Sequence, residues 1–282
     1  MTKIGFIDYF IDEWHANNYP TWIRQSSLAA EFEVALAWQE TQPEGKRTLE
    51  EWCQEQQVTP ALSLEQVVAE CDCLVVLSPD NPERHEDLCD LPLRSGKPVY
   101  VDKTFAPDLA SAQRLFAKAE AHRTPMYSCS ALRYIESLEH AVQELAGAQM
   151  EFAATRGPGS WGNYAVHQLE PLVMLLGTGA CRVMQIGTSR ARSLVVDYPD
   201  GRRGQVLQTA EHPFEFSALR GDETVVIADI GDSFPQFIEA MLAFFGSARV
   251  PVPKEQTLEI MALLEAGAAA LNTPDTWVSV PQ

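Results

Sequence analysis

Short apolar runs alternate with segments of helical spacing through roughly the first half of the chain, and this alternation constrains the fold more than any other feature. The runs are expected to form strands at residues 4–7, 32–38, 73–77, 98–102 and 125–129. The segments between them are expected to form helices at residues 48–57, 63–71, 84–96 and 108–123. Strand and helix in alternation predict a parallel, doubly wound sheet that binds ligands at the carboxyl ends of its strands.

The second half of the sequence has a different pattern. Its expected strands follow one another, with hairpin signals at residues 199–204 and 220–223. We expect strands at 150–157, 181–189, 192–198, 204–210, 213–219 and 224–229, and helices at 135–146, 167–177, 233–246 and 254–272. This pattern predicts an α+β domain whose sheet is largely antiparallel, with helices on one face. The 282 residues are therefore expected to form two domains, 1–130 and 131–282.

The charge balance limits the partners. A formal net charge of -18 repels phosphate-lined surfaces, so neither nucleic acid nor an anionic membrane is expected as a partner. The sequence shows no basic leader followed by an apolar run and no apolar stretch long enough to span a bilayer, so we expect a soluble, cytoplasmic protein. The six cysteines have no CxxC spacing and are expected to be reduced and mostly buried; the segment 71–73 favours the edge of a core strand over a metal site.

Several segments are similar to the Gfo/Idh/MocA oxidoreductases, a family that includes glucose-fructose oxidoreductase and inositol dehydrogenase. The likeness covers nearly the whole chain and is strongest in GKPVYVDKT, which resembles the family's Gly-Lys-x-Val-x-x-Glu-Lys-Pro segment with Asp102 for Glu and Thr104 for Pro. SPDNPERH is similar to the family's Thr-Pro-Asn loop, with Asp80 for Asn and an insertion before His85. SALRY and GSWGNYAVHQLEPLVMLLG complete the resemblance.

The resemblance implies a Rossmann domain that binds NAD or NADP, and oxidation or reduction of sugars, polyols or related alcohols. It implies that Ser78, Pro79 and Asp102 lie beside the cofactor. By the same resemblance, residues of the second domain that contact a small-molecule substrate are expected to include Arg133, Trp161 and Tyr164.

Lys103 directly follows an expected strand end, so its ammonium group is expected at the ligand-binding edge of the sheet. The resemblance makes it the family's catalytic-region lysine, which can hold a substrate hydroxyl and stabilise an alkoxide as hydride leaves. Without the flanking segment, a solvated lysine would be the simpler interpretation.

The position of His167 matches the histidine of the family's Asp-x-x-x-His pair. A histidine, with an ordinary pKa of about 6.5, can accept the hydroxyl proton during oxidation and return it in reduction. A capping or half-buried histidine is the structural alternative. The family's usual aspartate is Asn163 here, which can hydrogen-bond a substrate or orient the imidazole but cannot supply a charge that stabilises imidazolium. We expect Lys103 and His167 to converge on one pocket between the domains, with Asn163 as the third catalytic candidate.

The turn after the first expected strand departs from the family pattern. Glycines at this turn let backbone N–H groups approach a pyrophosphate. Aligned by eye, Asp8, Phe10 and Ile11 take the places of the glycines in this cofactor-binding turn, and Asp12 and Glu13 follow. A carboxylate ~4 Å from a phosphate would cost about 4 kcal/mol at an effective dielectric of ~20. Alternatively, Asp8 or Asp12 caps the following helix. Either way, the donors for a pyrophosphate are expected to be taken or repelled.

Two further polar positions have alternative interpretations. Glu40, after the second expected strand, is a candidate for binding a ribose hydroxyl or a solvated loop residue. The stretch 13–20 is rich in hydrogen-bonding groups, and its His15 is a candidate for substrate contact. We expect a hydrogen-bonded loop, with Pro20 opening or kinking the next helix, in preference to a metal site, because Asp12 and His15 lack a third ligand.

Two classes of function fit these observations. The first is an NAD(P)-dependent oxidoreductase acting on a small hydroxylated substrate. The second is a ligand-binding or regulatory descendant of the same fold that has lost dinucleotide binding. Phe214 and Phe216 alternate with Glu215 and Ser217, which indicates an apolar sheet face, and with the resemblance this predicts a homodimer or higher homo-oligomer.

Overall fold

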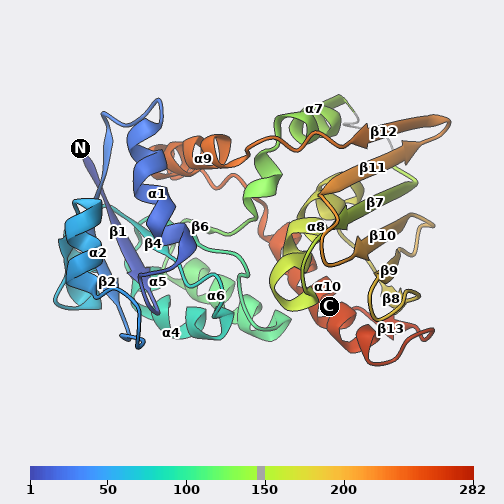
Figure 1. The fold of residues 1–282 in the computed structure, drawn as a ribbon, viewed down its shortest axis with the longest axis horizontal. Helices are drawn as coiled ribbons and strands as arrows, with labels where there is room; N and C mark the ends of the chain where they lie inside the picture. The colour runs from blue at the N-terminus through green and yellow to red at the C-terminus, as the bar shows by residue number, and fades with distance from the viewer. Residues whose placement is uncertain (145–149) are drawn as a thin grey trace. The chain divides into compact units, whose positions relative to one another are not determined.

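The computed structural model describes residues 1–144 and 150–282. Two compact units make up this structure (Figure 1). The first unit comprises residues 1–128 together with 234–253, and the second comprises 129–233 together with 254–282. Within the described residues, no helix has both the length and the apolar character needed to cross a bilayer.

The first unit is built on a six-stranded sheet in the order β3-β2-β1-β4-β5-β6, and every adjacent pair is parallel. Its strands are β1 (Thr2–Asp8), β2 (Phe32–Gln39), β3 (Thr59–Pro60), β4 (Cys73–Val76), β5 (Val99–Val101) and β6 (Met126–Tyr127). The predicted doubly wound parallel sheet is thus confirmed. Only β3, which has two residues, had no counterpart among the expected strands.

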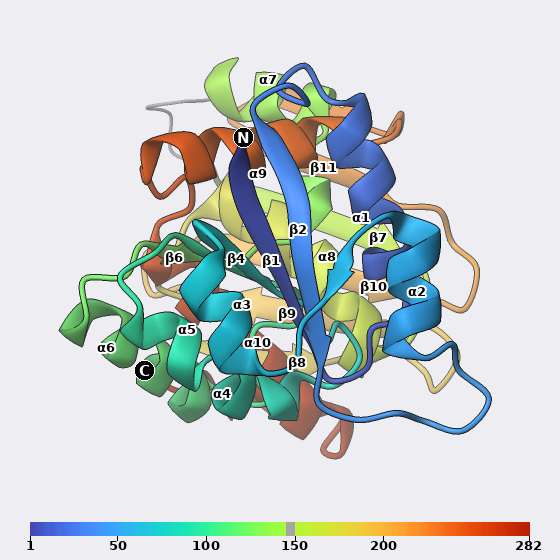
Figure 2. The same cartoon turned by 90° about the vertical axis from the view of Figure 1, so that its left-hand side faces the viewer.

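Helices cover both faces of this sheet (Figure 2). A Cβ on Gly5 would lie 2.4 Å from Val67 of α3, whereas the ring of the next residue, Phe6, lies 6.4 Å from that of Trp52 in α2. Because neighbouring residues of a strand point to opposite faces, α2 and α3 lie on opposite faces. The helices of this unit are α1 (Trp14–Gln25), α2 (Leu49–Gln56), α3 (Leu64–Glu70), α4 (His85–Leu88), α5 (Asp90–Arg94), α6 (Leu109–Ala121) and α9 (Phe234–Ser247), with a 3-10 turn η1 (Pro82–Arg84).

Two helical predictions in this unit are corrected. The single helix expected over 84–96 is divided at Cys89 into α4 and α5, because Pro92 has no N–H to donate to the carbonyl of Leu88. The loop expected over 13–20 is wrong, since α1 begins at Trp14 and contains Pro20. Glu13 caps α1, and the buried stripe of His15, Ala16, Tyr19, Pro20 and Ile23 holds it against the unit.

The second unit is built on a seven-stranded sheet in the order β12-β11-β7-β10-β9-β8-β13. Its strands are β7 (Phe152–Gly157), β8 (Arg182–Gln185), β9 (Arg192–Asp197), β10 (Arg203–Gln208), β11 (Glu215–Arg220), β12 (Glu223–Ile227) and β13 (Val278–Ser279). All pairs are antiparallel except β7 with β10, which confirms the largely antiparallel prediction. The strand β13 was not expected from the sequence.

The helices of the second unit are α7 (Glu136–Glu144), α8 (Trp161–Leu176) and α10 (Lys254–Leu271), with a 3-10 turn η2 (Ala131–Tyr134). The helix expected at 135–146 corresponds to α7, and its last two expected residues lie outside the described residues. The helix expected to begin at 167 begins six residues earlier, so both Asn163 and His167 lie inside α8. Trp161, the first residue of α8, contacts α10: its Nε1–H donates a hydrogen bond to the carbonyl oxygen of Leu264 at 3.0 Å.

The face of the second sheet that carries Phe216 is covered within the unit. A Cβ on Gly204 would lie 3.2 Å from Leu172 of α8, and the register places Val206 and Phe216 on the same face as Gly204. The predicted apolar face is confirmed at Phe216, which is fully buried, and it is covered within the unit; the homo-oligomer stays a prediction. The opposite face carries residues in register across six strands: the half-buried Met184, Val195, Gln205, Ala154 and Ser217, and the exposed Val226.

Candidate functional site

The carboxyl edge of the first sheet carries three buried polar side chains at the ends of three adjacent strands. Asp8 ends β1 and is 1% exposed, Ser78 follows β4 and is 2% exposed, and Asp102 follows β5 and is fully buried. Ser78 has a φ of 78°, in the left-handed region that residues with a Cβ rarely adopt. Among the residues that the structure describes, one carboxylate oxygen of Asp8 and the hydroxyl of Ser78 have no hydrogen-bond partner. Orphaned buried polar atoms on one edge mark it as the candidate site of this unit.

Asp102 holds His15 by a buried hydrogen bond between Oδ2 and the imidazole Nδ1. Its Oδ1 accepts hydrogen bonds from the Lys103 backbone N–H at 2.8 Å and from the Tyr100 hydroxyl at 3.2 Å. Burial alone would raise the pKa of Asp102, but the charge and hydrogen bond of His15 together with those of Lys103 outweigh burial, and the pKa is lowered. An ionised carboxylate only accepts hydrogen bonds, so Nδ1 of His15 carries the proton. The imidazole also stacks on Tyr19, with ring centroids 5.2 Å apart.

Glu13 occupies the N-terminus of α1 with its own carboxylate. Oε2 accepts a hydrogen bond from the backbone N–H of His15 at 2.7 Å, and Oε1 accepts one from that of Ala16. The Glu13 side chain is buried, and burial raises its pKa to about 7, with a further upward contribution from Asp102 and an opposing one from His15. The sequence predicted Asp8 or Asp12 as the cap of α1. Glu13 was noted only as a residue of the turn, and its capping role was missed.

The backbone amides between β1 and α1 are also used internally. Tyr9 and Phe10 hydrogen-bond to the Asp8 carboxylate, whose pKa is raised well above its usual value by burial and by Glu13. The N–H of Ile11, itself fully buried, donates to Oε1 of Gln39 at 2.9 Å. The Phe10 ring is half-buried, and the Nζ of Lys46 lies 5.4 Å from its centroid. The turn is therefore closed by its own side chains.

Asp12 and Glu40 have partners outside the turn. Asp12 pairs with Arg47 at 2.6 Å, and the hydrogen bond from this guanidinium lowers the pKa of Asp12 to about 2. Glu40 pairs with Arg84, which comes from the inserted segment before His85. The carboxylate expected beside a ribose is thus already bound to a guanidinium.

Lys103 lies at the end of β5 and is buried. Its Nζ lies 3.5 Å from the backbone oxygen of Pro79, at the limit of hydrogen bonding. Pro79, Ser78, Asp102 and Lys103, which the sequence assigned separately to cofactor binding and catalysis, are therefore neighbours at one edge of the sheet.

In the second unit, His167 is half-buried on α8, and Ser130 Oγ lies 2.7 Å from its Nδ1. Asn163, one turn earlier on α8, is exposed. Glu170, which the sequence interpretation missed, is buried; it accepts a hydrogen bond from the Ser130 backbone N–H at 3.0 Å and pairs with Arg133 at 2.5 Å. A glutamate three residues after a candidate histidine on one helix was the available signal.

The two aromatic substrate candidates of this unit differ in exposure. Tyr164 is 44% exposed, and its ring lies 5.7 Å from that of His167. Gly159, with a φ of 88°, leaves the space that Tyr164 fills, because a Cβ there would lie 2.3 Å from the tyrosine Cγ. Trp161 is buried against α10, so its contacts are structural rather than open to a substrate.

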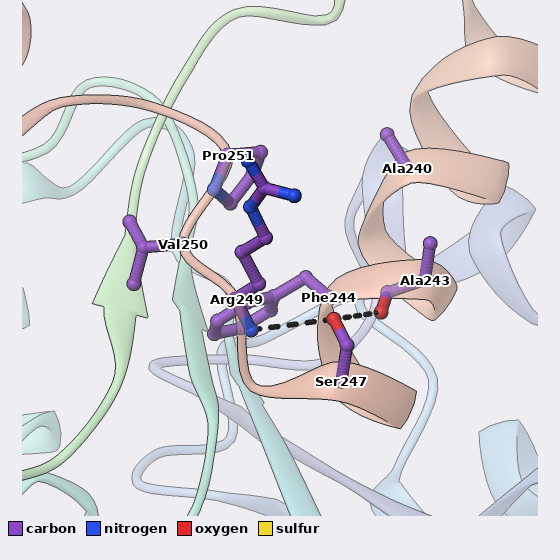
Figure 3. A pocket seen from close by; sticks show the side chains of 7 residues that line it. All are labelled: Ala240, Ala243, Phe244, Ser247, Arg249, Val250 and Pro251. Atoms are coloured by element: carbon purple, nitrogen blue, oxygen red, sulfur yellow. Dashed lines mark hydrogen bonds between the residues drawn. The ribbon is translucent and has the colours of Figure 1, made fainter.

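A hollow of about 400 Å³ lies at the C-terminal end of α9, away from these candidates in the sequence (Figure 3). Ala240, Ala243, Phe244, Ser247, Arg249, Val250 and Pro251 line it. Apart from the Arg249 guanidinium, its lining offers no group that titrates, so the hollow has no acid–base chemistry. Over residues 1–144 and 150–282, no group of three or more His, Cys, Asp or Glu side chains is placed to bind a metal ion.

The dinucleotide implied by the resemblance fits this edge only in part. The orphaned Ser78 hydroxyl, Lys103 and the end of β5 leave polar groups for a ligand. The pyrophosphate position does not fit, because the Glu13 carboxylate holds the helix N-terminus and Asp8 lies beside it. When ionised, both groups have the same sign of charge as a phosphate.

Comparison with known proteins supports the resemblance. Residues 10–128 match the model of the Gfo/Idh/MocA oxidoreductase family, described as having an NAD-binding Rossmann fold. No curated protein sequence matches the chain. The resemblance inferred from the sequence is confirmed over the matched residues, and the match begins inside the altered turn.

Solved structures share the fold over nearly the whole chain. A scyllo-inositol dehydrogenase from Lactobacillus casei, with NAD(H) and scyllo-inositol bound, is 13% identical, with a TM-score of 0.83 over 99% of both chains. A myo-inositol 2-dehydrogenase from Lactobacillus plantarum is 11% identical, with a TM-score of 0.80 over 99% of both chains. A UDP-N-acetylglucosamine 3-dehydrogenase from Acidithiobacillus ferrooxidans is 13% identical, with a TM-score of 0.77 over 95% of this chain and 97% of its own.

Proposed function

We propose that this chain, which matches the Gfo/Idh/MocA oxidoreductases over residues 10–128, is an oxidoreductase that acts on a CH–OH group of a small sugar, polyol or related alcohol. The observation that carries the proposal is the buried Lys103 at the end of β5, in the segment that most resembles the family. The dehydrogenases of inositols and of a nucleotide sugar that share the fold make a hydroxylated substrate the first choice.

In this proposal Lys103 donates a hydrogen bond to the reacting hydroxyl and stabilises the alkoxide that forms. His167 accepts the hydroxyl proton, and the Ser130 hydroxyl orients the imidazole through Nδ1. Asn163 cannot supply the charge of the family's aspartate, so His167 has less help in becoming imidazolium. Arg133 and Tyr164 are proposed to bind substrate hydroxyls.

The family implies NAD or NADP as the hydride acceptor. Because the β1–α1 turn does not fit a pyrophosphate, we derive no step through that group.

The test is a spectrophotometric screen of NAD⁺ and NADP⁺ with scyllo-inositol, myo-inositol and common hexoses as substrates. We expect slow oxidation of at least one polyol, abolished by Lys103→Ala and partly retained by Lys103→Arg. His167→Ala should lower kcat, whereas Asn163→Asp should raise it by restoring the carboxylate beside the histidine. Oxidation that Lys103→Ala leaves unchanged would remove the basis of the proposal.

A second candidate function is a ligand-binding or regulatory protein without redox activity. The closed turn favours it, since Glu13 and Asp8 take the amides that a dinucleotide needs. The two candidates differ in one observable: a regulatory protein binds a polyol or related metabolite in calorimetry but never produces reduced nicotinamide.

Assembly and location extend the proposal. The open sheet face with Val226, which is 60% exposed, supports a homodimer or higher homo-oligomer. The six cysteines, all within the described residues, are free thiols, as expected in the reducing cytoplasm. We therefore retain the cytoplasmic location.

A further inference from the structure

We infer that Glu13 is a built-in anion that closes the N-terminus of α1 to diphosphates, so that a dinucleotide binds at this turn only when the Glu13 carboxyl takes up a proton. The inference rests on the proposed function only in that it concerns the cofactor of that function. It also applies to a protein without redox activity that has kept the fold.

The geometry supplies the first argument. In a dinucleotide-binding turn, the amides at the helix N-terminus point at a phosphate. Here the amides of His15 and Ala16 point at the Glu13 carboxylate instead. A phosphate oxygen and the carboxylate cannot share these two donors, so a bound diphosphate has to displace Glu13 or approach it closely.

The charges around Glu13 supply the second argument. Besides burial, the negative charge of Asp102 after β5 raises the pKa of Glu13, and His15 on α1 lowers it. Asp8 on β1, whose own pKa is raised by burial and by Glu13, and Lys103 after β5, which lies beside Asp102, are further titratable groups at this edge. His15 is held by Asp102. On the loop before α2, Arg47 pairs with Asp12 and Glu55, and Lys46 donates to the Asp12 carbonyl oxygen. His15, Arg47 and Lys46 are therefore held by this chain's own oxygens, and a diphosphate would bring its negative charge close to Glu13 and Asp102.

Protonation opens the site without unfolding the helix. A neutral carboxyl still accepts one hydrogen bond through its carbonyl oxygen, and its O–H can donate to a phosphate oxygen. Because burial raises the pKa of Glu13 to about 7, the proton is taken up within the physiological range. The competent fraction is then about one eleventh at about pH 8 and about ten elevenths at about pH 6, so apparent affinity should change about tenfold.

The test is calorimetric titration of the full chain with ADP-ribose, which carries the pyrophosphate and keeps its charge between about pH 6 and about pH 8. We expect the wild-type protein to bind ADP-ribose about tenfold more tightly at the lower pH. Glu13→Gln, which removes the charge and keeps the side-chain size, should bind about tenfold more tightly than wild type at the higher pH and show no pH dependence. Nicotinamide riboside, which lacks the pyrophosphate, should show neither effect.

The matched control is Glu44→Gln, which removes an exposed charge from the loop before α2 and should leave ADP-ribose affinity unchanged. Chemical unfolding of each variant checks that the first unit is folded. Tight binding by wild type that is independent of pH would overturn the inference. The inference would also be overturned if Glu13→Gln gained no affinity for ADP-ribose at the higher pH, or if neither the variant nor wild type bound ADP-ribose at either pH.

Outcomes for the inference and for the proposed function are distinguishable. If wild type binds NAD⁺ tightly and oxidises a polyol at every pH, the inference fails and the function stands. If Glu13→Gln gains ADP-ribose affinity and no variant oxidises any substrate, the inference stands and the function fails.

Discussion

Replacing His15 by phenylalanine is expected to destabilise the protein by about 2 to 4 kcal/mol at neutral pH. The phenyl ring can keep the stacking on Tyr19, so the change removes mainly the Nδ1 donor. In this variant Oδ1 of Asp102 still accepts hydrogen bonds from the Lys103 backbone N–H and the Tyr100 hydroxyl. Oδ2 loses its hydrogen bond with His15.

The expected loss of stability is set by the cost of leaving the buried Asp102 carboxylate without its His15 partner. Losing a charge-assisted hydrogen bond costs about 1.5 to 3 kcal/mol, and breaking a buried ion pair costs about 3 to 5 kcal/mol. The cost has a ceiling, because Asp102 can take up a proton instead. For a carboxyl of ordinary pKa about 3.9, protonation at about pH 7 costs about 4 kcal/mol, and at about pH 5 only about 1.5 kcal/mol. The deficit should therefore shrink as the pH falls.

The assay is urea unfolding of wild type and His15→Phe at about pH 7 and about pH 5, followed by tryptophan fluorescence and by circular dichroism. Coincidence of the two signals checks whether the two units unfold together. Asp102→Asn and the double variant complete a cycle, and we expect a coupling of at least about 1 kcal/mol, because the double variant strands no charge. A deficit below about 1 kcal/mol that is equal at both pH values, with additive effects in the cycle, would refute the reasoning.

Three further predictions concern pH, packing and assembly. The folded pKa of Glu13, about 7, lies above the ordinary value of 4.5, so the native state binds more protons between these values; stability should fall by about 3 kcal/mol as the pH rises through this window, and Glu13→Gln should flatten the unfolding profile. Gly267→Ala places a Cβ 2.0 Å from Trp161, so it should destabilise the protein by about 1 to 3 kcal/mol and shift the tryptophan emission, despite the better helix propensity of alanine. Val226→Glu should shift any oligomer toward monomer in sedimentation, and a wild-type chain that is monomeric at micromolar concentration would contradict the assembly proposal.

The sequence was sufficient for the elements whose pattern is local. Apolar runs bounded by caps located the strands of the first sheet other than β3, and two hairpin turns located β9 to β12. The same local signals failed in α1, where Pro20 and the polar residues before it are typical of a loop. The helix forms because Glu13 satisfies its first amides and because its apolar stripe is buried, and the second of these conditions is tertiary.

The candidate site was predictable only where one segment carried it. The run through Asp102 and Lys103 could be recognised as it stands, whereas the pairing of His15 with Asp102 joins residues 87 positions apart. The closure of the turn was expected, but the capping role was assigned to Asp8 or Asp12. The carboxylates of Asp8, Asp12 and Glu13 are all close enough in the sequence to cap α1. Which of them does so depends on where each side chain points, and that is set by partners such as Arg47 that lie elsewhere in the sequence.

The most direct test of the account is the titration of the Glu13 carboxyl, followed by carbon-detected NMR on protein labelled at the glutamate carboxyl carbon, with Glu13→Gln to assign the signal. We expect a midpoint near pH 7, and the amide protons of His15 and Ala16 should shift with the same midpoint, because they donate to that carboxylate. A midpoint near the ordinary value of 4.5, with the two amides unaffected, would show that Glu13 does not occupy the helix N-terminus and would contradict the closed turn.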